Sequence, residues 1–123
     1  MKGLFLLLGC ILPMMVWGQK NISAAEFHDM ISKDSKLQIV DVRTPQEFAA
    51  GHINGAVNVD FRDPNFEKNI GKAVKKKKTV MVYCRSGRRS LNAMNLMVKN
   101  GFKEVYNMEG GMLVWEKEFE VEK

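Results

Sequence analysis

The sequence predicts a single α/β domain with a mainly parallel central sheet flanked by helices. Short β-branched runs alternate along the chain with segments of helical periodicity, as expected for strands joined by crossover helices. Residues 79–83 are almost continuously apolar, which is typical of a parallel strand buried on both faces. The chain has 123 residues, 46% of them hydrophobic and 27% charged. These values fit one domain and exclude a disordered tail or a coiled coil.

Residues 1–18 differ from the rest of the chain. An uncharged apolar run, residues 4–17, follows a lysine near the N-terminus. The run is shorter than the about 20 residues that a transmembrane helix needs. Gly18, with Val16 two positions before it, resembles a secretory cleavage site. We therefore expect residues 1–18 to be a signal peptide.

Cleavage after Gly18 gives an exported domain of residues 19–123, in the periplasm or another extracytoplasmic location. Two alternatives remain open. The segment ending at Cys10 resembles a lipoprotein signal, in which that cysteine is acylated and anchors the protein to a membrane. An uncleaved membrane anchor is the second alternative. In the favoured interpretation Cys84 is the only cysteine of the mature domain, which then forms no internal disulfide.

The net charge of +5 is concentrated locally, and four of the lysines, Lys75 to Lys78, are consecutive. Such a run is typical of a solvated turn between two elements. No aromatic residues interleave with it, as they do in proteins that bind single-stranded nucleic acid. We therefore expect no nucleic-acid partner, and a membrane partner only if the N-terminal segment is retained or lipidated.

Capping signals predict the first two helices. Ser23 and Glu26 form a capping box at the start of one helix, and residues 37–42 then read as a short buried strand. Thr44 and Glu47 form the second capping box, with Pro45 at the first helical position. Gly51 ends that helix.

The second half of the chain repeats the alternation. Residues 52–53 and 56–59 read as short extended pieces, and Asp63-Pro64 opens a helix that leads into the lysine run. The strongest strand, residues 79–83, ends at Cys84.

A loop and a mostly apolar helix through residues 91–98 follow, and this helix ends at Asn100-Gly101. The last strand, residues 105–108, leads through Gly110-Gly111 into a short terminal helix that contains Trp115.

Cys84 is the clearest candidate for chemistry. Ligands of parallel sheets bind beyond the carboxyl ends of the strands, where this cysteine lies. A loop running from a strand end into a helix can aim successive amides inward as an anion cradle, and nearby arginines add positive charge. Such surroundings favour the nucleophilic thiolate. A purely structural cysteine would suit an apolar loop better than one with a glycine and three arginines, of which Arg88 and Arg89 are the better candidates to face the site.

Four segments carry a family resemblance. They are Asp-Val-Arg-Thr-Pro-Gln-Glu-Phe at 41–48, Gly-His-Ile-Asn-Gly-Ala-Val-Asn at 51–58, Cys-Arg-Ser-Gly-Arg-Arg-Ser at 84–90, and Gly110-Gly111 with Trp115. Together they resemble the rhodanese-like domain family over residues 22–115. Each segment alone would be a weak signal, but the combination is highly specific.

The resemblance implies a single-domain sulfurtransferase. Cys84 would take a sulfane sulfur from a donor such as thiosulfate, become a persulfide, and pass the outer sulfur to a thiol or cyanide-type acceptor. The loop residues that would bind the substrate and stabilise the persulfide are Arg85, Ser86, Gly87, Arg88, Arg89 and Ser90. A double displacement of this kind needs one activated thiol and an anion cradle, and it needs no metal or organic cofactor.

The segment at 41–48 is expected to act indirectly. Arg43 and Glu47 lie four residues apart across a helix start, which predicts an ion pair or a capping role. Asp41 at a strand end could face the crevice or cap a neighbouring loop. His52 follows a helix-ending glycine, so a structural hydrogen bond is a better interpretation than a general base.

Three other functions fit parts of the pattern. Cysteine-dependent phosphatases use a loop of Cys, five residues and then Arg, whereas here Ser90 is six residues after Cys84 and Arg89 is five after it. An arsenate reductase would also need a resolving cysteine. A non-catalytic rhodanese module that binds a partner is the third alternative, and the retained cysteine and arginine-rich loop argue against it.

Overall fold

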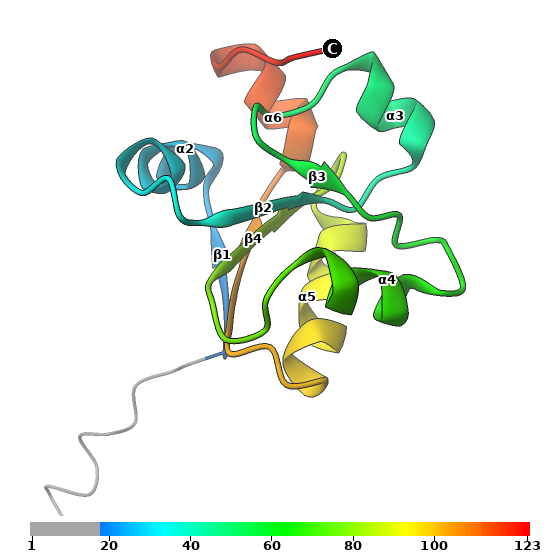
Figure 1. Ribbon diagram of the computed structural model, residues 1–123. Coiled ribbons are helices and arrows are strands. Elements are labelled where there is room, and N and C mark those ends of the chain that lie inside the picture. The colour runs from blue at the N-terminus through cyan, green and yellow to red at the C-terminus, as the bar shows by residue number, and fades with distance from the viewer. Residues whose placement is uncertain (1–17) are drawn as a thin grey trace, which may run out of the picture.

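Five parallel strands form one sheet in the order β1-β5-β4-β2-β3 in the computed structural model, which describes residues 18–123 (Figure 1). The strands are β1 (Gly18–Ile22), β2 (Gln38–Asp41), β3 (Val57–Asn58), β4 (Val80–Tyr83) and β5 (Glu104–Met108). The helices are α2 (Ala24–Lys33), α3 (Pro45–Ala50), α4 (Phe66–Ala73), α5 (Arg88–Lys99) and α6 (Gly111–Glu118). The predicted α/β class with a parallel sheet is confirmed. The apolar run before Gly18 and Cys10 lie outside the described residues.

Successive side chains of β4 point to opposite faces of the sheet, and they belong to two separate core clusters. Val80, Val82 and the following Cys84 belong to the core cluster that contains α4 and α5 side chains. Met81 and Tyr83 belong to the cluster on the other face, which contains side chains of α2 and α6. Helices therefore cover both faces of the sheet (Figure 1), and all four β4 residues are buried, as the apolar run predicted.

Both predicted capping boxes are present. The Glu26 amide donates to Ser23 Oγ at 3.1 Å, and the Glu47 amide donates to Thr44 Oγ1 at 3.3 Å. Each glutamate also accepts from the amide of its own cap residue. These local bonds satisfy amides that a helix start leaves unpaired.

The structure differs from the sequence prediction at three places. β1 was not predicted, because this edge strand is mostly polar and pairs only with β5. α4 begins at Phe66 rather than at Asp63, because the Asp63 carboxylate accepts the Asn65 amide at 2.8 Å and holds a turn there. α5 begins at Arg88, three residues earlier than expected.

The lysine run forms the predicted exposed turn, between α4 and β4. Within the part of the chain that the structure describes, none of the helices combines the length and apolar character required to cross a bilayer.

Candidate active site

Cys84 lies directly after β4, at the carboxyl edge of the sheet, and the residue has no exposed surface. β2 ends beside it, since Asp41 pairs with Tyr83 in the register of the two strands. The carboxyl ends of two central strands therefore meet at the cysteine. This is the position at which parallel sheets place their binding sites.

Three donors surround the Cys84 sulfur. The Gly87 amide lies 3.1 Å from Sγ, the Ser90 amide 3.4 Å and the Ser90 hydroxyl 3.3 Å. Gly87 is the N-cap of α5 and has no side chain to accept the amides of the first turn. The Cys84 sulfur accepts one of them instead. The positive end of the helix dipole thus lies at the sulfur, next to the three hydrogen-bond donors.

This geometry explains why α5 begins earlier than predicted. Gly87 has φ +101°, a left-handed conformation that turns the chain sharply from the loop into the helix. A Cβ there would lie 3.2 Å from the Gly110 nitrogen, so a side chain would also crowd the segment before α6. Arg88, Arg89 and Ser90 consequently form the first turn of α5 instead of a loop.

The start of α6 holds the other side of the loop. The Met112 amide donates to the Cys84 carbonyl at 2.9 Å, and the Leu113 amide donates to the Arg85 carbonyl at 3.0 Å. A Cβ at Gly111 would overlap both of these carbonyl oxygens. The Cys84 and Arg85 carbonyls therefore face α6, and the Gly87 and Ser90 amides face the sulfur.

The predicted loop residues take different positions. Gly87 and Ser90 contact the sulfur, whereas Arg85, Ser86 and Arg88 are exposed to solvent. Arg89 is partly buried and forms an ion pair with Glu47.

Arg89 makes a bidentate ion pair with Glu47 of α3. Its Nη1 donates to Oε1 at 2.8 Å, and its Nη2 donates to Oε2 at 3.0 Å. The hydrogen bond from Arg89 lowers the pKa of Glu47 to about 2, although partial burial opposes this and the Thr44 cap adds to it. The same bond raises the pKa of Arg89. The pair joins the first turn of α5 to the start of α3, so it fixes the helix that carries Ser90.

The sequence predicted an ion pair or a capping role for Arg43 and Glu47, and of these two the ion pair is wrong. Arg43 instead binds the buried Asp41 carboxylate, at 2.6 Å from Nη2 and 3.0 Å from Nε, and also donates to the Gly51 carbonyl at 2.6 Å. Burial opposes the charge of Arg43, but the bonds and charge of Asp41 outweigh it and raise the pKa of Arg43. Asp41 therefore accepts from Arg43, and Arg43 joins the end of β2 to the end of α3.

His52 has the structural role that the sequence predicted. Its Nδ1 lies 2.9 Å from the Phe48 carbonyl, and its ring stacks on the Phe48 ring with centroids 3.8 Å apart. The capping function predicted for Glu47 is present as well.

Comparison with known proteins identifies the family. A family model described as the rhodanese-like domain matches residues 23–118. The chain belongs to the rhodanese-like domain family. The domain is 40% identical over 100 residues to a Bacillus subtilis (strain 168) protein named "Putative sulfurtransferase YtwF", and the match covers 80% of this chain and 92% of that protein.

A crystal structure of a rhodanese-like domain protein from Staphylococcus aureus has a TM-score of 0.69 and 30% identity, with 78% of this chain and 90% of that chain covered. A tRNA uridine(34) hydroxylase of Chlamydia caviae is 34% identical over 88% of this chain, which spans only 34% of the hydroxylase. Family members therefore include proteins named for different reactions.

One polar residue that supports the site in this rhodanese-like domain was not predicted from the sequence. Asn107 of β5 is 2% exposed, and its amide donates to Asn21 Oδ1 at 3.0 Å and to the Gly87 carbonyl at 3.4 Å. The contact holds the N-cap of α5 from the sheet side. A single asparagine in a short apolar strand was the only sequence signal for it.

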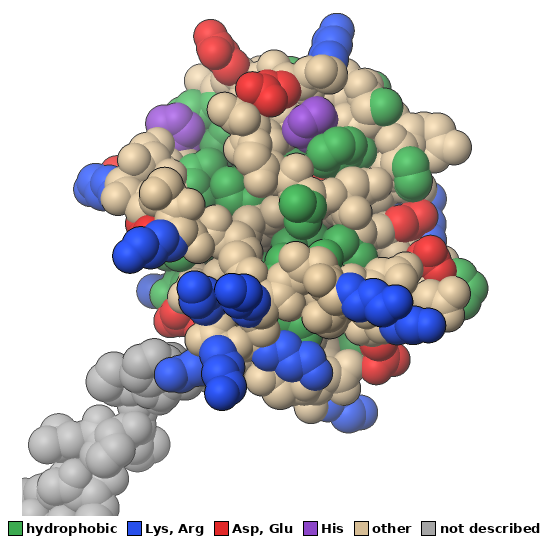
Figure 2. Space-filling model, in the orientation of Figure 1, with side chains coloured by type: hydrophobic (Ala, Val, Ile, Leu, Met, Phe, Trp, Pro, Cys, Tyr) green, Lys and Arg blue, Asp and Glu red, His purple; other side chains and the backbone are tan. Residues whose placement is uncertain are grey.

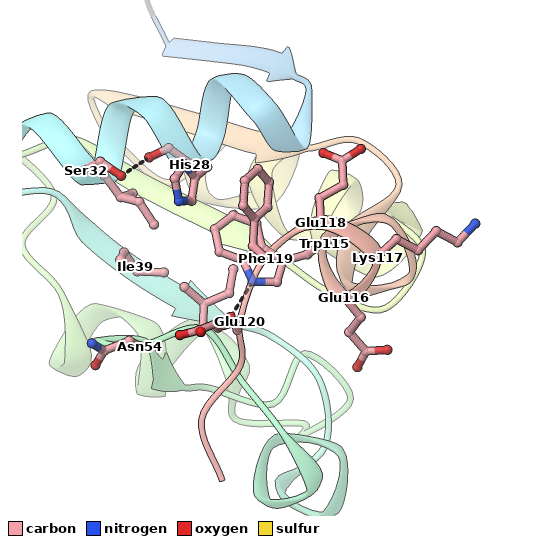
Figure 3. Close-up of a pocket in the computed structure, with 12 residues that line it drawn as sticks. His28, Ser32, Ile39, Asn54, Trp115, Glu116, Lys117, Glu118, Phe119 and Glu120 are labelled. Atoms are coloured by element: carbon pink, nitrogen blue, oxygen red, sulfur yellow. Dashed lines mark hydrogen bonds between the residues drawn. The ribbon is translucent and has the colours of Figure 1, made fainter.

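A hollow of about 680 Å³ lies between α2 and the segment of α6 and the residues after it (Figure 3). Trp115 and Phe119 line it together with His28, whose ring stacks on Phe119 with centroids 4.0 Å apart. No residue of the loop 84–90 lines it. The convergence of donors on the Cys84 sulfur, and not the size of a hollow, therefore marks the candidate active site.

Proposed function

We propose that this rhodanese-like domain is a sulfurtransferase that moves a sulfane sulfur from a donor such as thiosulfate to a thiol or cyanide-type acceptor through a Cys84 persulfide. The observation that carries the proposal is the arrangement at the sulfur, where two amides and a hydroxyl converge on Sγ at the N-terminus of α5.

The reaction takes two displacements. The Cys84 thiolate attacks the outer sulfur of thiosulfate, an S–S bond forms to the protein, and the S–S bond of thiosulfate breaks to release sulfite with its electron pair. The acceptor, for example cyanide, then attacks the outer sulfur of the persulfide. Thiocyanate leaves and the Cys84 thiolate is restored, so each step balances without a redox partner or cofactor.

The donors at the sulfur supply the stabilisation that both steps need. The negative charge resides on Cys84 before the attack and on the outer sulfur of the persulfide after it. Donors fixed by the Gly87 turn and by α5 are already oriented for this charge, so little reorganisation accompanies the reaction. The exposed Arg85 and Arg88 provide positive charge that attracts an anionic donor.

Access to the sulfur favours small donors. Cys84 has no exposed surface, so atoms that cover it must move aside before a donor can reach Sγ. A small oxyanion requires less displacement than a bulky ester does.

The arginine geometry supports sulfur transfer over phosphate chemistry. A phosphate-binding loop uses an arginine that donates two parallel hydrogen bonds to the oxyanion. Here both Nη atoms of Arg89 bind Glu47. We therefore propose negligible hydrolysis of aryl phosphates.

We further propose that the domain acts outside the cytoplasm, after cleavage behind Gly18, with acylation of Cys10 or a retained anchor as the alternatives. The apolar run at residues 4–17 supports export. Mass analysis of the N-terminal peptide from cell fractions tests this, since each alternative leaves a different N-terminus. An N-terminus beginning at Met1 in a cytoplasmic fraction would contradict export.

The function is tested by measuring thiocyanate formation from thiosulfate and cyanide. We expect the wild-type chain to form thiocyanate and the Cys84→Ser variant to be inactive. Circular dichroism should show that the variant is still folded. Wild-type activity no higher than that of the variant, across several sulfane donors, would instead favour a non-catalytic partner-binding module. Faster Cys84-dependent hydrolysis of an aryl phosphate would favour a phosphatase.

A further inference from the structure

Six lysines gather at the amino edge of the sheet, opposite Cys84. They are Lys36, Lys75, Lys76, Lys77, Lys78 and Lys103, and we call this set the lysine edge. The lysines come from the three segments that enter β2, β4 and β5, and all six are exposed. Figure 2 shows Lys and Arg side chains along the lower part of the molecule, where β4 and β5 begin in Figure 1.

Tertiary structure, and not the lysine run alone, creates this surface. Lys36, Lys77, Lys78 and Lys103 line a single hollow of about 310 Å³ together with Asp34 and Glu104. Residues 36 and 103 are far from the run in sequence, so the parallel topology brings them to it.

The backbone beneath the lysines is fixed by hydrogen bonds. The Gln38 side chain exchanges two bonds with the Lys75 backbone, at 2.8 Å and 3.0 Å. The Lys103 amide donates to the Lys76 carbonyl at 2.9 Å. The lysine edge is therefore a defined array of charges on an ordered turn.

These charges are not neutralised locally. In residues 18–123 the ion pairs are Lys33 with Asp29, Arg43 with Asp41 and Arg89 with Glu47, so no lysine of the edge takes part in one. Four of the six lysines line the hollow with two carboxylates, which leaves an excess of two positive charges there, and Lys75 and Lys76 of the edge add to it. The Glu104 carboxylate is also bound by the Thr79 and Tyr106 hydroxyls.

The attachment of the N-terminal segment lies at the same edge. β1 begins at Gly18, which pairs in register with Glu104 at the hollow. The apolar run at residues 4–17 immediately precedes Gly18 in the sequence, so it joins the domain beside the lysines. In the alternatives in which this segment is retained, or acylated at Cys10, it would add a second membrane signal to the charges of the lysine edge. After cleavage behind Gly18, the lysine edge acts by its charge alone.

The chemistry of the edge favours lipid over nucleic acid. Lysine is a compact, hydrated point charge suited to headgroup phosphates, and no aromatic side chain lines the hollow to stack a base. We propose that the lysine edge binds the surface of an anionic phospholipid membrane, with the Cys84 edge facing away from it. The proposal is independent of the reaction that Cys84 performs.

The test compares how the full chain partitions onto phosphatidylcholine vesicles and onto the same vesicles with added phosphatidylglycerol. The ratio of the two partition coefficients cancels any contribution of the apolar run, which is equal for both vesicles. Since each lysine near an anionic surface contributes about 1 kcal/mol, the triple variant Lys77→Gln, Lys78→Gln, Lys103→Gln should lower this ratio at least about tenfold. High salt should lower the wild-type ratio as well.

The matched control is the triple variant Arg62→Gln, Lys117→Gln, Lys123→Gln, which removes the same charge from exposed positions outside the edge. We expect this control to keep nearly the wild-type ratio, because its charges do not face the vesicle. Equal losses in the two triple variants would assign the effect to net charge and overturn the proposal. A wild-type ratio near one would overturn it as well.

Two further outcomes are decisive. Chemical acetylation of vesicle-bound protein should be slowed at Lys77 and Lys103 but not at Lys117, and the reverse pattern would contradict the proposed orientation. Binding to a single-stranded RNA that depends on the lysine edge, with vesicle binding unchanged in the edge variant, would assign this surface to nucleic acid instead.

Discussion

The two edges of the sheet differ in how their polar groups are satisfied. At the carboxyl edge, the Asp41–Arg43 pair is buried and the Cys84 sulfur accepts three donors. At the amino edge, the six lysines are exposed and outside any ion pair of the described residues. Both edges belong to the same parallel strands, so topology alone does not make an edge a reaction site.

The difference lies in desolvation. A buried charge must be paired, and its loss leaves an uncompensated group in the interior. An exposed charge is hydrated and can be removed at little cost to stability. Substitutions at the carboxyl edge should therefore change folding and chemistry together, whereas those at the amino edge should change neither.

The largest expected effect on stability is at the buried ion pair. Asp41→Asn removes the charge that compensates Arg43, and we expect a loss of about 3 kcal/mol in the free energy of unfolding, measured by urea denaturation. Asp29→Asn is the control, because it breaks the exposed Lys33 pair of α2 and should cost at most about 0.5 kcal/mol. Similar losses in both variants would remove the contrast between the edges.

Glycine substitutions should give the next largest effect. Gly111→Ala places a Cβ against the carbonyls of Cys84 and Arg85 at positive φ, so we expect a loss of about 2–4 kcal/mol and a large fall in sulfur transfer. Gly101→Ala, near the end of α5, also has positive φ but has no atom within 4 Å of the new Cβ. It should cost about 1 kcal/mol and leave activity unchanged. A fully active Gly111→Ala variant would show that the α6 contact does not shape the loop.

The ion pair between α3 and α5 should have a moderate effect. Glu47→Gln keeps a side chain that can cap α3 but removes the charge that holds Arg89, so we expect kcat to fall by about tenfold with KM for thiosulfate little changed. Glu26→Gln is the control, because it makes the same change in a capping box that has no arginine partner. Equal kinetics for the two variants would mean that Glu47 only caps its helix.

The pH dependence of this pair has a defined sign. Arg89 lowers the pKa of Glu47 from 4.5 to about 2, so the folded state binds this proton less readily than the unfolded state. The stabilisation is complete above about pH 4.5 and is lost as the pH falls towards 2. Urea denaturation should show the difference between wild type and Glu47→Gln shrinking across that interval. A difference that grows as the pH falls would contradict the ion pair.

The smallest effect is expected at the amino edge. The triple variant Lys77→Gln, Lys78→Gln, Lys103→Gln should stay within about 0.5 kcal/mol of wild type and keep its sulfur-transfer rate. Thermal unfolding and the thiocyanate assay measure both quantities. A loss of sulfur-transfer activity in this variant would show that the amino edge influences the chemistry at Cys84.

Structural features that depend only on residues close together in the sequence were predictable. The two capping boxes, the buried strand at 79–83 and the location of Cys84 at its end all follow from local pattern. The polar edge strand β1 has no such pattern, because it is defined by its pairing with β5.

Side-chain partners at the site were less predictable. Spacing suggested Arg43 with Glu47, but Glu47 binds Arg89, which is 42 residues away. The fold brings the start of α3 within reach of the first turn of α5, and this tertiary proximity decides the choice. The start of α5 at Arg88 similarly depends on the Gly87 turn and on the sulfur that accepts an amide of the first turn.

The most direct test of the central claim is the intact mass of the protein before and after incubation with thiosulfate. The sulfurtransferase proposal predicts that the wild-type chain gains the mass of one sulfur atom, that the Cys84→Ser variant gains nothing, and that cyanide removes the added mass. An unchanged wild-type mass, or an equal gain in the Cys84→Ser variant, would contradict a persulfide at Cys84.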